Sequence, residues 1–185
     1  MTDTKAQPTI AVDIVSEFRG PDLDELCHAA IAAIADGGGF GWLKPPPRHI
    51  MEAYWKGILL VPDRKLFVAR LDGTVAGSAL LVRPPRNNEA QAFAATLSGT
   101  FMAPWARGYG LARLLVRRVE ETARELGVQV LNLDLRDTQQ AAIQLFETCG
   151  YRRWGTHPAY ARVEGRIIPG HYYWKPLVPE AEPAP

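Results

Sequence analysis

Two glycines, Gly108 and Gly110, follow Arg107 and precede a long amphipathic segment. A helix that begins there exposes backbone N–H groups that have no acceptor within the helix, and its dipole adds partial positive charge at the same end. A phosphate or pyrophosphate is the natural ligand of such a site, and glycine lets it approach because no Cβ intervenes. Two glycines alone are more typical of a tight turn, but Arg107 could supply charge to a phosphate. The pattern predicts a phosphate-bearing ligand at the start of residues 108–126.

Neither of two common nucleotide-binding motifs matches this loop fully. A dinucleotide fingerprint needs a small residue three positions after the second glycine, where this chain has Arg113. It also needs a strand that runs directly into the first glycine, but residues 104–107 intervene. Asp134 lies at roughly the distance where a ribose-binding acid belongs, so a dinucleotide-binding domain stays open as an alternative. The phosphate loop of the Gly-x-x-x-x-Gly-Lys-Ser/Thr type is absent from the sequence.

Two longer motifs follow one another along the chain. Residues 102–112 read Met-Ala-Pro-Trp-Ala-Arg-Gly-Tyr-Gly-Leu-Ala, and residues 139–151 read Gln-Gln-Ala-Ala-Ile-Gln-Leu-Phe-Glu-Thr-Cys-Gly-Tyr. The first resembles the acetyl-CoA signature of the GCN5-related N-acetyltransferase (GNAT) superfamily, Arg/Gln-x-x-Gly-x-Gly/Ala after a strand that ends in x-Pro. The second is similar to that family's Asn-x-x-Ala-x-x-Leu-Tyr-x-x-x-Gly-Phe landmark. The resemblance covers residues 62–177 and looks closest to the tabtoxin-resistance type of small-molecule acetyltransferase.

The resemblance implies an enzyme that binds acetyl-CoA and transfers the acetyl group directly to the amine of a small molecule, with CoA as product. The pantetheine arm would pair with the backbone of residues 101–103, and the N–H of Met102 would polarise the thioester carbonyl. The cofactor-binding residues that the family pattern implies are Phe101, Met102, Ala103, Arg107, Gly108, Tyr109, Gly110, Leu111, Ala112, Gln139 and Phe146.

Acid–base residues are less well marked. Many family members have a tyrosine where this chain has Phe146, and a glutamate on the strand that here offers Ser98, Gly99 and Thr100. A non-catalytic acyl-CoA-binding module is therefore an alternative function. Asp134, near the end of an interior strand, is the first candidate base, although a charge at a helix N-terminus or a salt bridge with Arg136 would explain it equally well.

The candidate acids come from the end of the second motif and from the final strands. Cys149 lies about one helical turn after Phe146 and could carry a proton, although a buried cysteine at a helix cap is the plainer interpretation. Tyrosines of the final strands border the acceptor site in this family; Tyr172 is the candidate taken from the group Tyr151, Tyr160, Tyr172 and Tyr173. His157 and His171 have suitable intrinsic pKa values, but a lone histidine in a loop is more often solvated.

The acceptor site is marked by one glycine-rich aromatic loop, residues 37–44, between the first two predicted helices. In this family the region covers the acceptor pocket, so Phe40 and Trp42 are candidates for stacking on the substrate. A connector whose aromatic side chains fill the edge of the core is the alternative interpretation.

Composition limits the remaining function classes. The chain has 185 residues, 47% of them hydrophobic, and a net charge of +1, which gives no electrostatic footprint for nucleic acid or an anionic membrane. We therefore expect no nucleic-acid or membrane partner and a cytoplasmic protein, because a signal peptide and a membrane-spanning apolar run are both missing from the sequence. Cys27 and Cys149 are expected to be reduced, and no spacing predicts a metal site. Homodimers are common in the family, so a homodimer is an open expectation.

Hydrophobic periodicity and turn residues predict a mixed α/β (α+β) fold with six to seven strands in one sheet and about four helices. Residues 1–8 are expected to be a flexible tail, residues 9–177 a single domain, and residues 178–185 a Pro-rich disordered tail. In the GNAT fold a bulge splays the strand at residues 95–103 from the strand at 128–135, and this opens the CoA cleft. The expected strands are 9–16, 65–71, 74–82, 90–103, 128–135, 151–163 and 166–176, and the expected helices 21–36, 48–58, 108–126 and 138–149.

Overall fold

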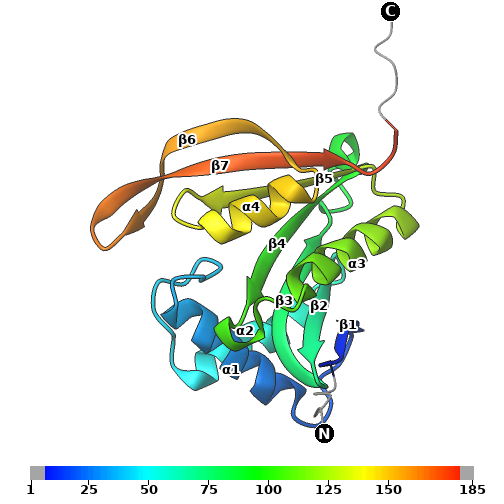
Figure 1. Cartoon of the computed structure of the whole chain (residues 1–185). Helices are drawn as coiled ribbons and strands as arrows, with labels where there is room; N and C mark the ends of the chain where they lie inside the picture. Colours follow the sequence, from blue (N-terminus) through cyan, green and yellow to red (C-terminus); the bar gives the residue numbers. More distant parts are fainter. Residues whose placement is uncertain (1–6, 180–185) are drawn as a thin grey trace, which may run out of the picture.

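A computed structural model describes residues 7–179, which form one seven-stranded mixed sheet with four α-helices, as the sequence predicts (Figure 1). The strand order in the sheet is β1-β2-β3-β4-β5-β7-β6. The predicted tails, residues 1–8 and 178–185, lie largely outside the described residues. The elements are β1 (Ile10–Val15), α1 (Asp22–Ala35), α2 (Arg48–Leu59), β2 (Arg64–Leu71), β3 (Thr74–Val82), β4 (Ala94–Met102), α3 (Leu111–Glu125), β5 (Val130–Arg136), α4 (Gln140–Thr148), β6 (Arg152–Val163) and β7 (Arg166–Pro176).

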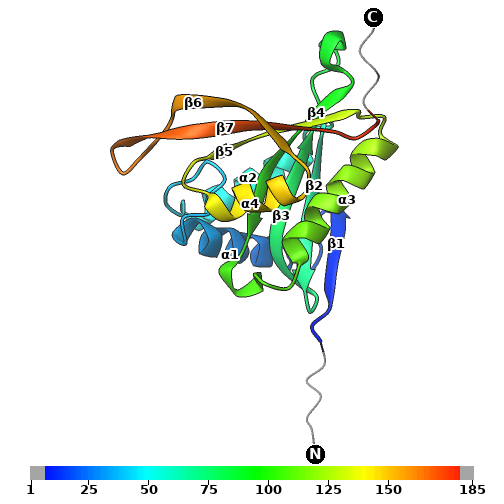
Figure 2. The same ribbon diagram turned by 45° about the horizontal axis from the view of Figure 1, so that its top comes forward.

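Helices cover both faces of the sheet and enclose two apolar cores (Figure 2). α1 and α2 pack on one face of β2, β3 and β4, where Trp55 and Phe101 lie in the core. α3 packs on the opposite face because Leu111, Leu115 and Val119 form one buried stripe along it. α4 joins that second core through Ile143 and Phe146. The two layers hold β4 and β5 at the centre of the molecule.

β4 and β5 part from one another along their length, and this opens the sheet. Their parallel pairing extends only over residues 94–96 and 130–132. On its other side β4 pairs with β3 through a register shift between Ser78 and Leu80, next to Gly99, which has φ +57°. The predicted bulge and splay are therefore confirmed, and the side chains beyond the divergence are free to line a cleft.

Two elements begin three or four residues later than predicted, for local reasons. The strand predicted at 90–103 begins only at Ala94, because residues 89–91 form a 3₁₀ turn. The helix predicted from residue 108 begins at Leu111, because Gly108 and Gly110 adopt φ values of +86° and +77° that a right-handed helix excludes.

Candidate active site

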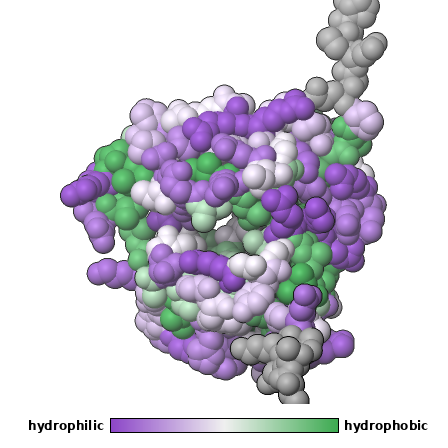
Figure 3. All heavy atoms as spheres, in the orientation of Figure 1, coloured by the Kyte–Doolittle hydropathy of each residue, from purple (hydrophilic) through white to green (hydrophobic). Residues whose placement is uncertain are grey.

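Two cavities adjoin one another where β4 and β5 diverge. The first, of about 430 Å³, lies between the end of α1, the end of β4 and the starts of α3 and α4. The second, of about 490 Å³, lies between β4, β5, β6 and the loop after α1. Thr100, Gln139 and Phe146 line both cavities. Figure 3 shows the surface hollowed near the centre of this face. A group bound in one cavity can therefore meet a group bound in the other.

The loop before α3 has the features of an anion site. A Cβ placed on Gly108 or Gly110 would meet no atom within 4 Å, so the space in front of both residues is open. α3 has no side-chain cap at its N-terminus, which leaves its first backbone N–H groups without a side-chain acceptor. Ala112 lines the first cavity, whereas the side chain of Leu111 is buried in the core and can contribute only its backbone. Tyr109 is about half exposed. These residues fit a pyrophosphate.

Arg107 already has a carboxylate partner in this structure. Its Nη1 lies 2.5 Å from Oδ2 of Asp36, which follows α1 and lines the same cavity. Both side chains are about half exposed, and ion pairs of that kind contribute only about 0–1 kcal/mol. A phosphate group in the cavity would therefore compete with Asp36 for the guanidinium at little cost.

The end of β4 presents Met102 to the cleft. The N–H of Ala103 donates to the carbonyl of Ala76 on β3, at 2.8 Å. Because successive peptide groups of a strand point to opposite sides, the N–H of Met102 faces β5. A guanidinium N–H of Arg107 lies 3.4 Å from the carbonyl oxygen of Met102, which faces the same way. The expected contact through Ala103 is not supported, because Ala103 is fully buried and its N–H is used within the sheet.

Phe146 and Gln139 have structural partners at the junction. Phe146 is buried and packs edge-on against Tyr151, with 5.2 Å between the ring centroids. Because phenylalanine has no ionisable group, this position supplies no proton. The side-chain oxygen of Gln139 accepts from the N–H of Arg136, and its amide nitrogen donates to the carbonyl of Gly39 at 3.3 Å. Gln139 thus holds the loop after α1 against the end of β5.

Asp134 has a tyrosine partner in the second cavity. The hydroxyl of Tyr160 donates a hydrogen bond to the Asp134 carboxylate. Burial and this carboxylate raise the pKa of Tyr160, so the phenol keeps its proton. The alternative salt bridge between Asp134 and Arg136 does not form in the part of the chain that the structure describes.

A β-bulge positions Tyr160. The pairing of β6 with β7 shifts register between His157 and Ala161, and the Tyr160 ring lies directly over Gly170, where a Cβ would collide with it. Tyr160 therefore reaches Asp134 although it is 26 residues away in the chain. Sequence reasoning considered it only as one of four tyrosines.

The other two candidate acids lie outside both cavities. Tyr172 pairs with Asp134 in the β5–β7 register, but its ring packs against Trp154 at 5.5 Å, and it lines neither cavity. Cys149 ends α4, where its carbonyl accepts from the Lys175 ammonium at 2.6 Å, and burial raises the pKa of its thiol. The structure therefore supports neither Tyr172 nor Cys149 as the acid and brings Tyr160 to the site instead.

The aromatic loop divides its residues between the cavity and the core. Phe40 lines the second cavity and stacks on Phe101, with ring centroids 4.9 Å apart. Trp42 lines neither cavity and packs edge-on against Tyr54 of α2, as expected for a side chain that fills the edge of the core. Leu43, which sequence reasoning did not select, lines the second cavity and is half exposed.

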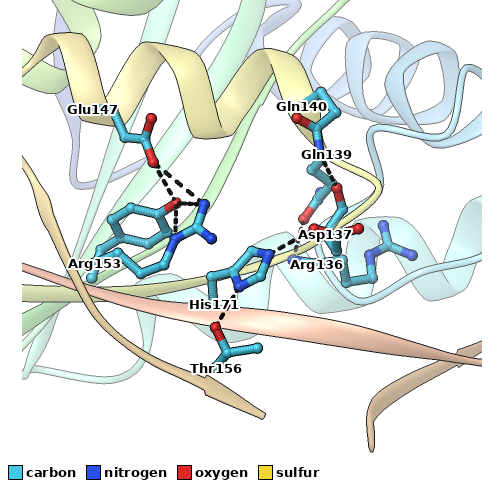
Figure 4. Close-up of polar contacts among 9 residues, drawn as sticks. Arg136, Asp137, Gln139, Gln140, Glu147, Arg153, Thr156 and His171 are labelled. Carbon is cyan, nitrogen blue, oxygen red and sulfur yellow. Dashed lines mark hydrogen bonds and ion pairs between the residues drawn. The ribbon is translucent and has the colours of Figure 1, made fainter. Parts of the chain in front are cut away.

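A second polar cluster lies beside the site (Figure 4). Nε2 of His171 is 2.7 Å from Asp137 and its Nδ1 is 2.9 Å from the hydroxyl of Thr156. His171 is almost fully buried and lines neither cavity, which is unlike the solvated loop histidine expected from the sequence. The cluster ties the segment before α4 to β6 and β7.

Comparison with known proteins identifies this arrangement. A family model described as the acetyltransferase (GNAT) family matches residues 29–151. The chain belongs to this family. An uncharacterised N-acetyltransferase from the hisH–hisA intergenic region of Azospirillum brasilense is 60% identical over 131 residues, which are 71% of this chain and 78% of that protein. The predicted N-acetyltransferase activity is thereby confirmed, and a dinucleotide-binding domain is disfavoured.

Solved structures agree with the GNAT fold. An N-acetyltransferase from Staphylococcus aureus Mu50 superposes with a TM-score of 0.76 at 19% identity, over 92% of this chain and 99% of that chain. A GNAT superfamily phosphinothricin acetyltransferase from Sinorhizobium meliloti, in complex with acetyl-CoA, superposes with a TM-score of 0.71 at 21% identity. The match covers 92% of this chain and 88% of that chain. The predicted fold is therefore confirmed, whereas nearness to the tabtoxin-resistance type stays a prediction.

Residues 7–179 contain neither a membrane-spanning helix nor a cluster of metal ligands. Within this range no helix is long and apolar enough to cross a membrane. Over the same residues, no group of three or more His, Cys, Asp or Glu side chains is arranged to hold a metal ion. Both cysteines are free thiols.

Proposed function

We propose that this GNAT enzyme transfers the acetyl group of acetyl-CoA to the amine of a small molecule by direct attack. The observation that carries the proposal is the pair of adjoining cavities that share Thr100, Gln139 and Phe146. A donor thioester in the first cavity and an acceptor amine in the second would meet at these residues. Such an arrangement favours a single displacement, because it needs no protein nucleophile.

The first cavity is the proposed acetyl-CoA site. The open loop at Gly108 and Gly110, the start of α3 and Arg107 are arranged to hold the pyrophosphate. The N–H of Met102, directed at the cleft, is the proposed donor that polarises the thioester carbonyl. The acetyl-CoA bound to the Sinorhizobium meliloti enzyme supports this choice of donor substrate.

The second cavity is the proposed acceptor site. Its volume of about 490 Å³ is within the usual range for small ligands. Asp134 is the proposed base that accepts a proton from the amine, directly or through water, and the neutral Tyr160 hydroxyl orients that carboxylate. The amine nitrogen then forms a bond to the acetyl carbon while the carbon–sulfur bond breaks.

Thr100 is the proposed group at the leaving thiolate. Its hydroxyl is buried at the junction and has no hydrogen-bond partner among the described residues. A rotation about χ1 of Thr100 would turn this hydroxyl toward the junction, where it could donate a hydrogen bond to the sulfur as negative charge develops on it. The proton that completes the thiol comes from solvent. This arrangement would compensate for the absence of a tyrosine at Phe146.

The test is release of free CoA thiol from acetyl-CoA with a panel of small amines, with the N-acetyl product confirmed by mass spectrometry. Asp134→Asn should lower kcat by about 100-fold, the lower range of general-base effects. Asp63→Asn is the matched control, because Asp63 lies outside both cavities. Release of thiol without an N-acetyl product, or equal loss in both variants, would count against the proposal. Cytoplasmic location, homodimerisation and a single domain over residues 9–177 stay predictions.

A further inference from the structure

Arg136, the last residue of β5, is a buried charge that has no carboxylate partner in the described part of the chain. Its side chain lines the second cavity, and the residue is only 9% exposed. One guanidinium nitrogen donates to the carbonyl of Gly39 at 2.7 Å, and no Asp or Glu of the described chain lies within ion-pair distance of Arg136. Burying an ionised group without an opposite charge is costly, so such a group normally has a charged partner. Within residues 7–179 the chain supplies no such partner.

The neighbouring carboxylates are already engaged elsewhere. Asp134 accepts from Tyr160, and Asp137 accepts from His171. Figure 4 shows that Arg136 extends away from His171. The remaining charged residue that lines the second cavity is Arg162, an exposed side chain near the rim. The cavity wall therefore carries two guanidinium groups and one carboxylate.

We infer that the acceptor carries a carboxylate as well as its amine, so that it is an amino acid or a compound of that kind. This inference rests on the proposed function of the second cavity. The amine would lie at Asp134 and Tyr160, and the carboxylate would accept hydrogen bonds from Arg136. A guanidinium has five N–H donors and Gly39 uses one, so donors remain for a carboxylate.

The spacing along β5 agrees with such a molecule. Asp134 and Arg136 are two residues apart, so they share one face of the strand and their Cα atoms lie about 7 Å apart. Their side chains can converge on groups of opposite charge within one small ligand. An amine without an acidic group would leave the Arg136 charge uncompensated when it fills the cavity.

The inference is tested with eight L-amino acids of differing side chains, each compared with the amine that lacks the carboxylate, for example L-phenylalanine with phenethylamine. Rates of N-acetylation give kcat/KM for each member of a pair. In the wild-type enzyme at least one amino acid should exceed its partner amine by about 10- to 100-fold, the usual gain from hydrogen bonds to a charged group. Arg136→Gln should bring that ratio close to one through KM, and Arg136→Lys should retain part of it.

Gln139→Ala tests whether Arg136 only holds the loop after α1 in place and does not bind the substrate. It is suitable because Gln139 also donates to the carbonyl of Gly39. This variant loosens the same loop contact without removing charge, so it should change the rates but preserve the ratio within each pair. Circular dichroism melting of every variant checks folding.

Binding is measured as well, by calorimetric titration of each pair into the enzyme with CoA present, where transfer cannot occur. An enzyme that acetylates amines but shows no preference for the carboxylate in rate or in binding would overturn this inference alone. A preference that persists in Arg136→Gln, or amino acids that fail to bind, would also overturn it. Failure of the proposed function is distinct, because then either acetyl-CoA itself would not bind or no amine of the panel would be N-acetylated.

Discussion

Gly110→Ala tests the proposed acetyl-CoA site separately from the stability of α3. Gly110 has φ +77°, and a Cβ there meets no protein atom within 4 Å, so an alanine is strained but does not collide. The left-handed conformation costs an L-residue about 1–2 kcal/mol. For a chain of this size we expect a fall in Tm of about 2–8 °C. The added methyl group occupies the open space in which the pyrophosphate would approach the backbone.

Gly127→Ala is the matched control at the other end of the same helix. Gly127 also has φ +77° and open space around its Cβ position, and it lines neither cavity. Both variants should therefore lose similar stability. Calorimetric titration with acetyl-CoA should show at least about a 10-fold weaker affinity for Gly110→Ala, which is 1.4 kcal/mol or more, and an unchanged affinity for Gly127→Ala.

Two results would refute this reasoning. Wild-type affinity in both variants would mean that the pyrophosphate does not contact the loop at residues 108–112. Equal weakening in both would mean that strain in α3, rather than the occupied space, controls binding. Acetyl-CoA that fails to bind the wild-type protein would remove the basis of the proposed donor site altogether.

The remaining predictions concern two titrating groups. The pKa of Tyr160 is raised in the folded state by burial and by Asp134, so its stabilising contribution is complete below the unfolded pKa of about 10 and is lost as the pH rises further. Urea unfolding from pH 8 to 11 should therefore show a shallower decline in Tyr160→Phe than in wild type; parallel curves would contradict this. Burial raises the pKa of Cys27 to about 11, so its alkylation by iodoacetamide at pH 8 should occur only with global unfolding, as mass spectrometry can follow; rapid labelling of the native protein would contradict it.

The elements and the conformation of the loop before α3 could be predicted from the sequence because they depend on local patterns. The stripe that contains Leu111, Leu115 and Val119 predicts α3, and Asp72 and Gly73, with φ values of +49° and +83°, form the expected hairpin turn between β2 and β3. The left-handed conformations of the glycines before α3 likewise depend on residues that are close in the chain.

The proposed acceptor site could be predicted less well from the sequence, because it depends on contacts between distant segments. Tyr172 is the register partner of Asp134, yet the bulge in β6 gives the contact to Tyr160. Periodicity cannot place a bulge of this kind, since each strand still reads as a run of alternating residues. In the same way, the pairing of Arg107 with Asp36 joins residues that are 71 positions apart.

The segment after α1 connects the two proposed substrates physically. Asp36 lines the first cavity and pairs with Arg107, whereas Gly39 lines the second and accepts hydrogen bonds from Arg136 and Gln139. Only Gly37 and Gly38 separate these contacts, so we expect a displacement at one end to reach the other. A pyrophosphate that takes Arg107 from Asp36 therefore acts on the same short segment that Arg136 holds. For this reason, the effect of a substitution between Asp36 and Leu43 has to be measured on both substrates before it is assigned to either.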